Sequence, residues 1–340
     1  MKAVSEFMDA RRPTIYDVAR EAGVSPATVS RVLNTPSLVN EDKRKKILEV
    51  IEDLQFIPKA EAVAKARQRY KRIAVIAPFF TEPSFMERLK GISSVLGSEH
   101  YELVLYAVDS YEELIGYIDL IVTTKQVDGL ICLSLNLDEA VSLKIKKAQL
   151  PVCFVEQKHA DFDSVCIDNH EGGWLCAKFL YDRGCRSPAF VGEFSSQNFV
   201  THASQQRLDG FVSFFLRYGI EIEEQCICMG MSGKEISDSE LKALLENANQ
   251  VDCVFATSDI LAVRVIKCAM ELGMHIPDDL AVVGFDDIQM AEYVNLTTLD
   301  QSLVDSGSLA AQMLLQRLRN PDLPIHASVI PLRIAQRGSA

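Results

Sequence analysis

Residues 14–34, TIYDVAREAGVSPATVSRVLN, constrain the fold of this 340-residue chain more than any other segment. Apolar residues recur at helical spacing on both sides of Gly23. Glycine adopts a positive φ without strain, so Gly23 predicts the end of one helix, and Ser25 with Pro26 predicts the start of the next. A third amphipathic helix, expected over 40–54, would cover this pair. The segment therefore predicts a three-helix unit containing a helix-turn-helix.

The second predicted helix leaves Thr28, Ser30, Arg31 and Asn34 on its outer face. These residue types donate hydrogen bonds to phosphates and base edges, and such a helix fits the major groove. Residues 1–72 contain 15 Lys and Arg against 10 Asp and Glu, whereas the remainder contains 20 against 37. A basic head on an acidic body favours DNA binding over the alternative, a helical hairpin with no nucleic-acid role.

The first residues of the chain and its cysteines indicate where the protein acts and which kinds of site it contains. The first twelve residues are polar and charged, and no apolar run approaches the roughly 18 residues of a membrane span. We therefore expect a cytoplasmic, nucleoid-associated protein that does not contact membranes. Nine cysteines fit a reducing compartment as buried thiols. The close pair Cys226 and Cys228 lacks a second ligand pair, so we expect neither a metal site nor a cofactor.

Beyond residue 71, strand-like and helix-like segments alternate, beginning with RIAVIAPF at 72–79 and restarting after Asp168. This rhythm predicts an α/β body of two doubly wound parallel sheets in two similar lobes. Such sheets bind ligands at the carboxyl ends of their strands, so we expect a pocket between the lobes. No dinucleotide, phosphate-loop, nucleophile-elbow or zinc-protease motif is present, so we do not expect an enzyme.

Polar residues follow several predicted strands. Glu156 and Gln157 come after PVCFV, Ser258 and Asp259 after CVFAT, and Asp286 after VVGF. Carboxylates and hydroxyls beside aromatic residues suit a sugar or a similar polar metabolite. Asp259 is equally consistent with a helix cap.

Head and body together resemble the lactose-repressor and galactose-repressor family of bacterial transcription regulators, over essentially the whole chain. Besides the 14–34 motif, the resemblance is carried by FIP at 56–58, VCIDNHEGG around Asp168, QRLDGF around Arg207, VVGFDD at 282–287 and TTLDQ ending at Gln301. It implies a periplasmic-binding-protein-like core of two lobes that dimerises, and a short hinge that couples effector binding to DNA binding.

The resemblance also implies a domain plan. It comprises a flexible N-terminus at 1–12, a DNA-binding domain at 13–57, a hinge at 58–71 and an effector-binding, dimerising core at 72–340. Within the core, one lobe is expected at about 72–165 plus 290–320, and the other at 166–289 plus 321–340.

In the implied effector site, Arg207 holds a ligand hydroxyl or carboxylate, while Glu156 and Asp286 accept hydrogen bonds from hydroxyls. Phe79 and Phe80 match an aromatic stacking position, although core packing is the other interpretation of both. The expected effector-binding residues are Phe79, Phe80, Glu156, Gln157, Arg207, Ser258, Asp259, Asp286 and Gln301.

On the DNA side, Pro26 and Ala27 occupy the base-reading positions and offer only methylene and methyl contacts. Hydrogen-bonded readout is therefore expected chiefly from Arg31, to guanine. The expected DNA-binding residues are Thr14, Tyr16, Ser25, Pro26, Ala27, Thr28, Ser30, Arg31, Asn34 and Lys65.

The implied function is that of a homodimeric repressor that binds an inverted-repeat operator beside carbohydrate-use genes and is released by a sugar-like effector. A corepressor-dependent repressor or an activator remains open. A sugar-binding transport component or a sugar-phosphate enzyme is a remote alternative, because neither explains the DNA-binding head.

The hinge departs from the family pattern, because Lys65 stands where relatives carry a leucine that wedges into the minor groove. We expect the stretch 59–72 to form a helix that holds the minor groove electrostatically through Lys65, Arg67 and Arg69, with weaker kinking of the duplex. Circular-permutation assays measure the bend. A bend as large as that of leucine-hinged relatives would contradict this prediction.

Overall fold

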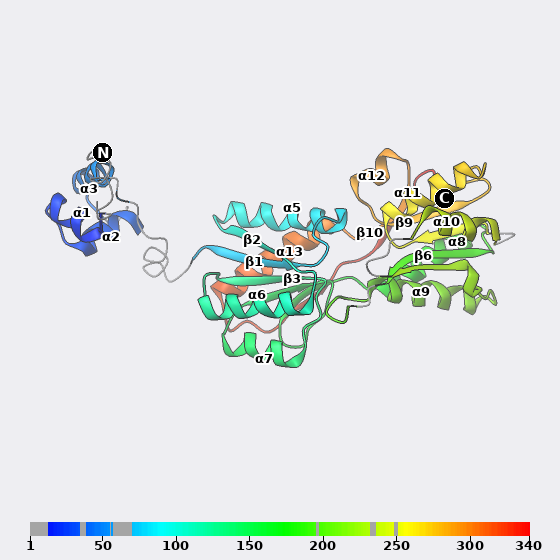
Figure 1. The fold of residues 1–340 in the computed structure, drawn as a ribbon, viewed down its shortest axis with the longest axis horizontal. Helices are drawn as coiled ribbons and strands as arrows, with labels where there is room; N and C mark the ends of the chain where they lie inside the picture. Colours follow the sequence, from blue (N-terminus) through cyan, green and yellow to red (C-terminus); the bar gives the residue numbers. More distant parts are fainter. Residues whose placement is uncertain are drawn as a thin grey trace, which may run out of the picture. The chain divides into compact units, whose positions relative to one another are not determined.

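The computed structural model describes residues 13–34, 39–54, 56, 70–194, 197–231, 236–247 and 251–340. The chain divides into two compact units, residues 1–72 and residues 73–340 (Figure 1). None of the helices in these described ranges is long and apolar enough to cross a membrane.

The first unit contains three helices, α1 (Ile15–Ala22), α2 (Pro26–Asn34) and α3 (Glu41–Asp53). Gly23 ends α1 with a φ of +69°, in the left-handed region that the sequence argument requires. The three helices bury a shared core, whose fully buried members are Val18, Ala19, Ala22, Val29, Val32 and Ile47. The predicted helix-turn-helix head is therefore confirmed.

Local hydrogen bonds fix the start of two of these helices. The Asp17 carboxylate accepts the backbone N–H of Thr14 at 2.9 Å and its hydroxyl at 2.6 Å. The Asn40 side chain accepts the backbone N–H of Asp42 at the start of α3. Each bond satisfies a polar group that a helix terminus would otherwise leave without a partner.

The first lobe of the second unit is a six-stranded sheet in the order β11-β5-β4-β3-β1-β2. Its strands are β1 (Arg72–Ala77), β2 (Glu102–Ala107), β3 (Gly129–Leu133), β4 (Val152–Val155), β5 (Asp163–Cys166) and β11 (Ala327–Val329). Helices cover both faces (Figure 1), namely α5 (Pro83–Ser98) with α13 (Leu303–Arg319) on one and α6 (Tyr111–Thr124) with α7 (Glu139–Lys147) on the other.

The second lobe repeats this plan with the order β12-β10-β9-β8-β6-β7. Its strands are β6 (Pro188–Phe194), β7 (Ile227–Met231), β8 (Cys253–Ala256), β9 (Ala281–Asp286), β10 (Thr297–Asp300) and β12 (Arg333–Ala335), of which β12 runs antiparallel. One face carries α8 (Asn169–Asp182) and α9 (Ala203–Arg217), and the other α10 (Asp238–Asn247) and α11 (Asp259–Glu271). The shorter η2 (Glu224–Cys226) and α12 (Gln289–Tyr293) complete it.

Successive side chains of a strand point to opposite faces of the sheet, so each strand contributes to both of the helix-covered layers. In β1, Ile73 and Val75 face the α5–α13 layer, whereas Ala74 and Ile76 face the α6–α7 layer. All four side chains are fully buried, because a parallel sheet with helices on both faces has no solvent-facing side. The predicted pair of doubly wound parallel sheets is confirmed.

The crossovers between the lobes correct the expected boundaries. β10 pairs with β9 and so completes the second sheet, although it lies within 290–320. β11 pairs with β5 in the first sheet, although it lies within 321–340. The chain therefore crosses after β10 and again between β11 and β12, because the backbone hydrogen bonds of these short strands assign them to opposite sheets.

Each lobe contains one close helix crossing that depends on two glycines. A Cβ on Gly91 of α5 would lie 2.0 Å from the Val304 carbonyl oxygen, and one on Gly307 of α13 would lie 2.1 Å from that of Arg88. In the second lobe, Gly173 of α8 and Gly210 of α9 approach each other's helix in the same way. Because glycine carries only a hydrogen where other residues carry Cβ, the backbones of the two crossing helices come into contact.

We predict that Gly307→Ala destabilises the protein by about 1–3 kcal/mol, because the added methyl group has no space against α5. Gly116→Ala is the matched control, since its Cβ would meet nothing within 4 Å in helix α6. That control should gain about 0.5–1 kcal/mol from helix propensity. Urea unfolding measures both changes, and equal effects of the two substitutions would contradict the predicted contact.

Candidate functional site

Several strand ends at the carboxyl edges of the two sheets have left-handed backbone. Phe79, Ser134 and Glu156 in the first lobe have φ values of +51°, +51° and +70°, and Asp286 in the second lobe has +123°. Non-glycine residues adopt such conformations at a cost of about 1–3 kcal/mol each, and they gather at functional sites. This edge is also where a doubly wound sheet binds ligands.

A buried ion pair joins α5 to one of these strand ends. The Nη2 atom of Arg88 donates to the Glu156 carboxylate at 2.5 Å and to the side-chain oxygen of Gln301 at 2.9 Å. The Ser134 hydroxyl donates to the other Glu156 oxygen. Arg88 is 2% exposed, and its Nε atom has no hydrogen-bond partner within the described structure. One buried donor of the guanidinium thus remains unused.

The same network continues into the second lobe. The side-chain amide of Gln301 donates to Asp286 at the end of β9. Arg207, on α9, lies over the Phe285 ring at 3.5 Å and donates to Asn169 at 2.9 Å. The structure therefore gathers five side chains from both lobes, which we call the charged cluster: Arg88, Glu156, Arg207, Asp286 and Gln301.

Burial and neighbouring charges shift the pKa values of residues in the charged cluster. Burial raises the pKa of Asp286 to about 6, although Arg207 and Arg88 oppose the shift. Burial lowers the pKa of Arg207, and Asp286 and Glu156 oppose that shift. Two guanidiniums and two carboxyl groups are thus held together in a largely dry site, where electrostatic interactions are stronger than in water.

Four residues of the charged cluster were predicted from sequence, and Arg88 was not. Asp259 requires a correction, because it is fully buried and its carboxylate accepts the Ile288 N–H at 2.8 Å and the Thr298 hydroxyl. Burial also raises the pKa of Asp259 to about 8. This side chain braces the second lobe from inside, so it is neither an effector contact nor a helix cap.

Of the other predicted effector residues, Ser258 and Phe80 have local structural contacts. The Ser258 hydroxyl accepts the Leu261 N–H and caps α11. Phe80 packs against the core of the first lobe, as the packing interpretation expects, whereas Phe79 is 40% exposed and lies edge-on to Phe85. Gln157 is half-buried beside Glu156.

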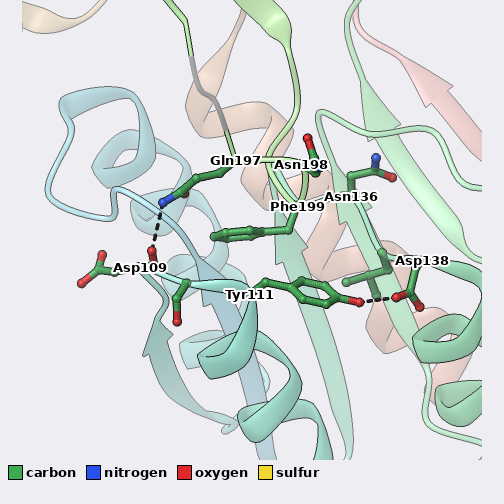
Figure 2. Close-up of a pocket in the computed structure, with 9 residues that line it drawn as sticks. Asp109, Tyr111, Asn136, Asp138, Gln197, Asn198 and Phe199 are labelled. Carbon is green, nitrogen blue, oxygen red and sulfur yellow. Dashed lines mark hydrogen bonds between the residues drawn. The ribbon is translucent and has the colours of Figure 1, made fainter. Parts of the chain in front are cut away.

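A pocket of about 560 Å³ lies among loops from both lobes (Figure 2). It is formed where loops after β2, β3 and β6 meet, and none of its residues was predicted from sequence. The Tyr111 hydroxyl points to the Asp138 carboxylate, and Gln197 donates to the Asp109 carbonyl oxygen at 3.0 Å. The lining residues are Asp109, Ser110, Tyr111, Asn136, Leu137, Asp138, Gln197, Asn198 and Phe199.

The predicted DNA-reading residues share the surface of the head. Tyr16 is 71% exposed, and Ala27 and Arg31 on α2 are exposed as well. The Ser25 hydroxyl accepts the Thr28 N–H at the start of this helix. Thr14 is held by Asp17, while Pro26 and Ser30 are half-buried. The side chain of Asn34, and Lys65 with most of the hinge, lie outside the described residues.

One group of possible metal ligands occurs in the described part of the chain. The ligand atoms of Cys185, Asp252 and Cys253 lie within 4.8 Å of one another. Three donors fall short of the four that a structural zinc site uses. The two Asp252 oxygens also accept the backbone N–H groups of Arg186 and Ser187. This group therefore carries no metal assignment.

A helix-turn-helix head joined to a two-lobed α/β body is the architecture of a DNA-binding regulator. Residues 14–59 match the model for bacterial regulatory proteins of the lacI family, and residues 177–340 match a periplasmic binding protein-like domain. Catabolite control protein A of Priestia megaterium is 30% identical over 330 residues, which cover 96% of this chain and 98% of that protein. The chain belongs to the lacI family.

Solved structures show the same architecture. A lacI-family regulator from Silicibacter pomeroyi is 25% identical, with a TM-score of 0.82 over 96% of this chain and 99% of its own. The regulator CelR, in complex with cellobiose, is 26% identical, with a TM-score of 0.69 over 97% of this chain and all of its own. The protein is accordingly a DNA-binding transcription regulator and not an enzyme.

We predict that Arg88→Met destabilises the protein by about 2–4 kcal/mol, because it leaves the Glu156 carboxylate, whose side chain is 10% exposed, without its compensating charge. The double variant Arg88→Met with Glu156→Gln should recover much of that loss, since no buried charge is then stranded. Urea unfolding of the two single variants and the double variant tests this as a mutant cycle. Additive losses would contradict the pairing.

Proposed function

We propose that this regulator is a homodimeric repressor of carbohydrate-use genes, acting on chromosomal DNA in the cytoplasm and released by a sugar-like effector. The observation that carries the proposal is the charged cluster, which joins the two lobes of the body through Arg88, Gln301 and Asp286. A ligand that competes for these groups alters how the lobes are held. The relative in complex with cellobiose supports a sugar-like effector.

The effector contacts in this proposal are hydrogen bonds to Glu156, Arg207, Asp286 and Gln301. Carboxylates accept from hydroxyl groups, and a guanidinium donates to hydroxyl or carboxylate oxygens in a fixed geometry. The unused Nε donor of Arg88 supports a ligand oxygen at the cluster, because a buried donor without a partner costs free energy. Gln157, Ser258 and Phe79 follow strand ends at the same edges and complete the proposed site.

A second copy of the chain is the partner proposed for an exposed apolar face on the second lobe. Met270, Tyr293 and Val294 are 66%, 73% and 43% exposed. They lie on α11 and at the end of α12, where a hollow is lined by Val263, Ile266, Lys267, Met270, Glu271 and Val294. A two-fold pairing of such a face places two heads on two half-sites, which accounts for an inverted-repeat operator.

On DNA, we propose that α2 enters the major groove with Arg31 reading guanine beside the methyl and methylene contacts of Ala27 and Pro26. Phosphate anchoring by Thr14, Tyr16, Ser25, Thr28, Ser30 and Asn34, with Lys65 in the minor groove, completes the interface. Effector binding is coupled to this interface with about 1–3 kcal/mol, which corresponds to a 5- to 150-fold change in operator affinity.

The test begins with selection of bound sequences from randomised duplexes, where an inverted repeat is expected. Arg31→Ala should then weaken binding to the selected operator by about 1–3 kcal/mol per half-site and relax the preference at one base pair. Tyr16→Phe is the matched control, because loss of a phosphate contact weakens binding to all sequences alike. Fluorescence anisotropy at fixed salt measures both.

Unchanged base preference in Arg31→Ala would reject the assignment of this residue as the base reader. The same assay with candidate sugars decides the direction of regulation. Weaker operator binding supports release by an effector, whereas stronger binding would replace this proposal with corepressor dependence.

A further inference from the structure

A backbone bridge adjoins residues of both the pocket of Figure 2 and the Glu156 network. Leu135 and Val200 form an isolated antiparallel bridge between the two lobes. The N–H of Asn136 donates to the Phe199 carbonyl oxygen at 2.8 Å, and the N–H of Thr201 donates to that of Ser134 at 3.0 Å. Ser134 belongs to the network of Glu156, while Asn136 and Phe199 line the pocket. We call the charged cluster and this pocket, which share no residue, the two compartments of the cleft.

The two compartments differ in charge. The charged cluster balances two arginines with two carboxyl groups, whereas the described lining of the pocket includes two carboxylates, Asp109 and Asp138, and no lysine or arginine. The Asp138 carboxylate accepts hydrogen bonds from the Tyr111 hydroxyl and from the backbone N–H groups of Val141 and Ala140, while the side chain itself is exposed to the pocket. An anionic ligand would be repelled here, and a ligand with hydroxyl donors would be accepted.

Two aromatic rings line the pocket, the half-buried Tyr111 and Phe199, which is 5% exposed and packs with the core of the first lobe. Tyr111 begins α6 in the first lobe, and Phe199 follows β6 in the second, with ring centroids 6.3 Å apart and planes inclined by 38° (Figure 2). The side chains of Asp109, Asn136 and Asn198 are exposed around these rings. Apolar rings rimmed by carboxylates and amides suit the CH faces and hydroxyls of a sugar ring. A volume of about 560 Å³ accommodates a molecule of that size.

We propose that this pocket is a second ligand site, independent of the charged cluster, that takes a neutral polyhydroxylated ring such as a hexose or an unphosphorylated disaccharide. The inference goes beyond the proposed effector site, because its residues contribute nothing to the charged cluster. A ligand here contacts both lobes beside the bridge and so gives the regulator a second input.

The experiment is isothermal titration of the full-length protein with glucose, maltose and cellobiose, and with glucose 6-phosphate as the anionic probe. We expect saturable binding of at least one neutral sugar. Tyr111→Ala and Asn136→Ala should each weaken that binding at least tenfold. Asn136→Ala retains the backbone hydrogen bond of the bridge, so it separates ligand contact from structure. Thermal unfolding without ligand confirms that each variant folds.

The variant Glu156→Gln shows which of the two compartments binds the neutral sugar. If neutral-sugar binding survives Glu156→Gln but fails in the two pocket variants, the second site is supported. Loss of binding in Glu156→Gln would overturn the proposal, whether or not the pocket variants also fail. Absence of neutral-sugar binding, or equal binding of glucose 6-phosphate that depends on Tyr111, would overturn it as well. Operator binding by the same variants reports separately on the proposed regulatory function.

Discussion

Both faces of a parallel sheet are covered by helices, so polar side chains of such a fold can gather only where its strands end. This constraint places the functional chemistry of the body. Glu156 and Asp286 end strands of different sheets, and the guanidinium of Arg88 reaches the first directly and the second through Gln301. Because Arg88, Asp286 and Gln301 are buried, loss of one partner leaves the others poorly compensated.

Short-range patterns were enough to predict the architecture. Helical spacing around Gly23 predicted the head, and alternating segments predicted the two sheets, because both signals arise from neighbouring residues. β10 and β11 contain only four and three residues, too few for a periodic signal, so their assignment to opposite sheets was missed. Pairing between distant segments, not local pattern, decides where these strands belong.

The candidate site was only partly predictable for the same reason. Glu156, Arg207 and Asp286 stand in motifs that a resemblance can identify, whereas Arg88 lies in the middle of α5 with nothing local to mark it as buried. Asp259 follows a strand, which is where effector-binding residues were expected. Its hydrogen-bond partners, Ile288 and Thr298, are distant in the sequence, so its structural role could not be predicted. The pocket combines three loops, whose meeting depends on the packing of two lobes.

The two glycine-dependent helix crossings differ in how far apart their two helices lie in the sequence. In the second lobe, α8 and α9 are neighbours in sequence, separated by β6. In the first lobe, the helix that packs against α5 is α13, which begins only at residue 303. During synthesis the α8–α9 crossing can form once residue 217 has emerged, while the α5–α13 crossing must await residues beyond 303, and both sheets gain their last strands, β11 and β12, only near the end of the chain. The amino-terminal lobe thus carries an incompletely covered sheet face for most of synthesis, with apolar surface exposed to chaperones or to neighbouring chains in the interval.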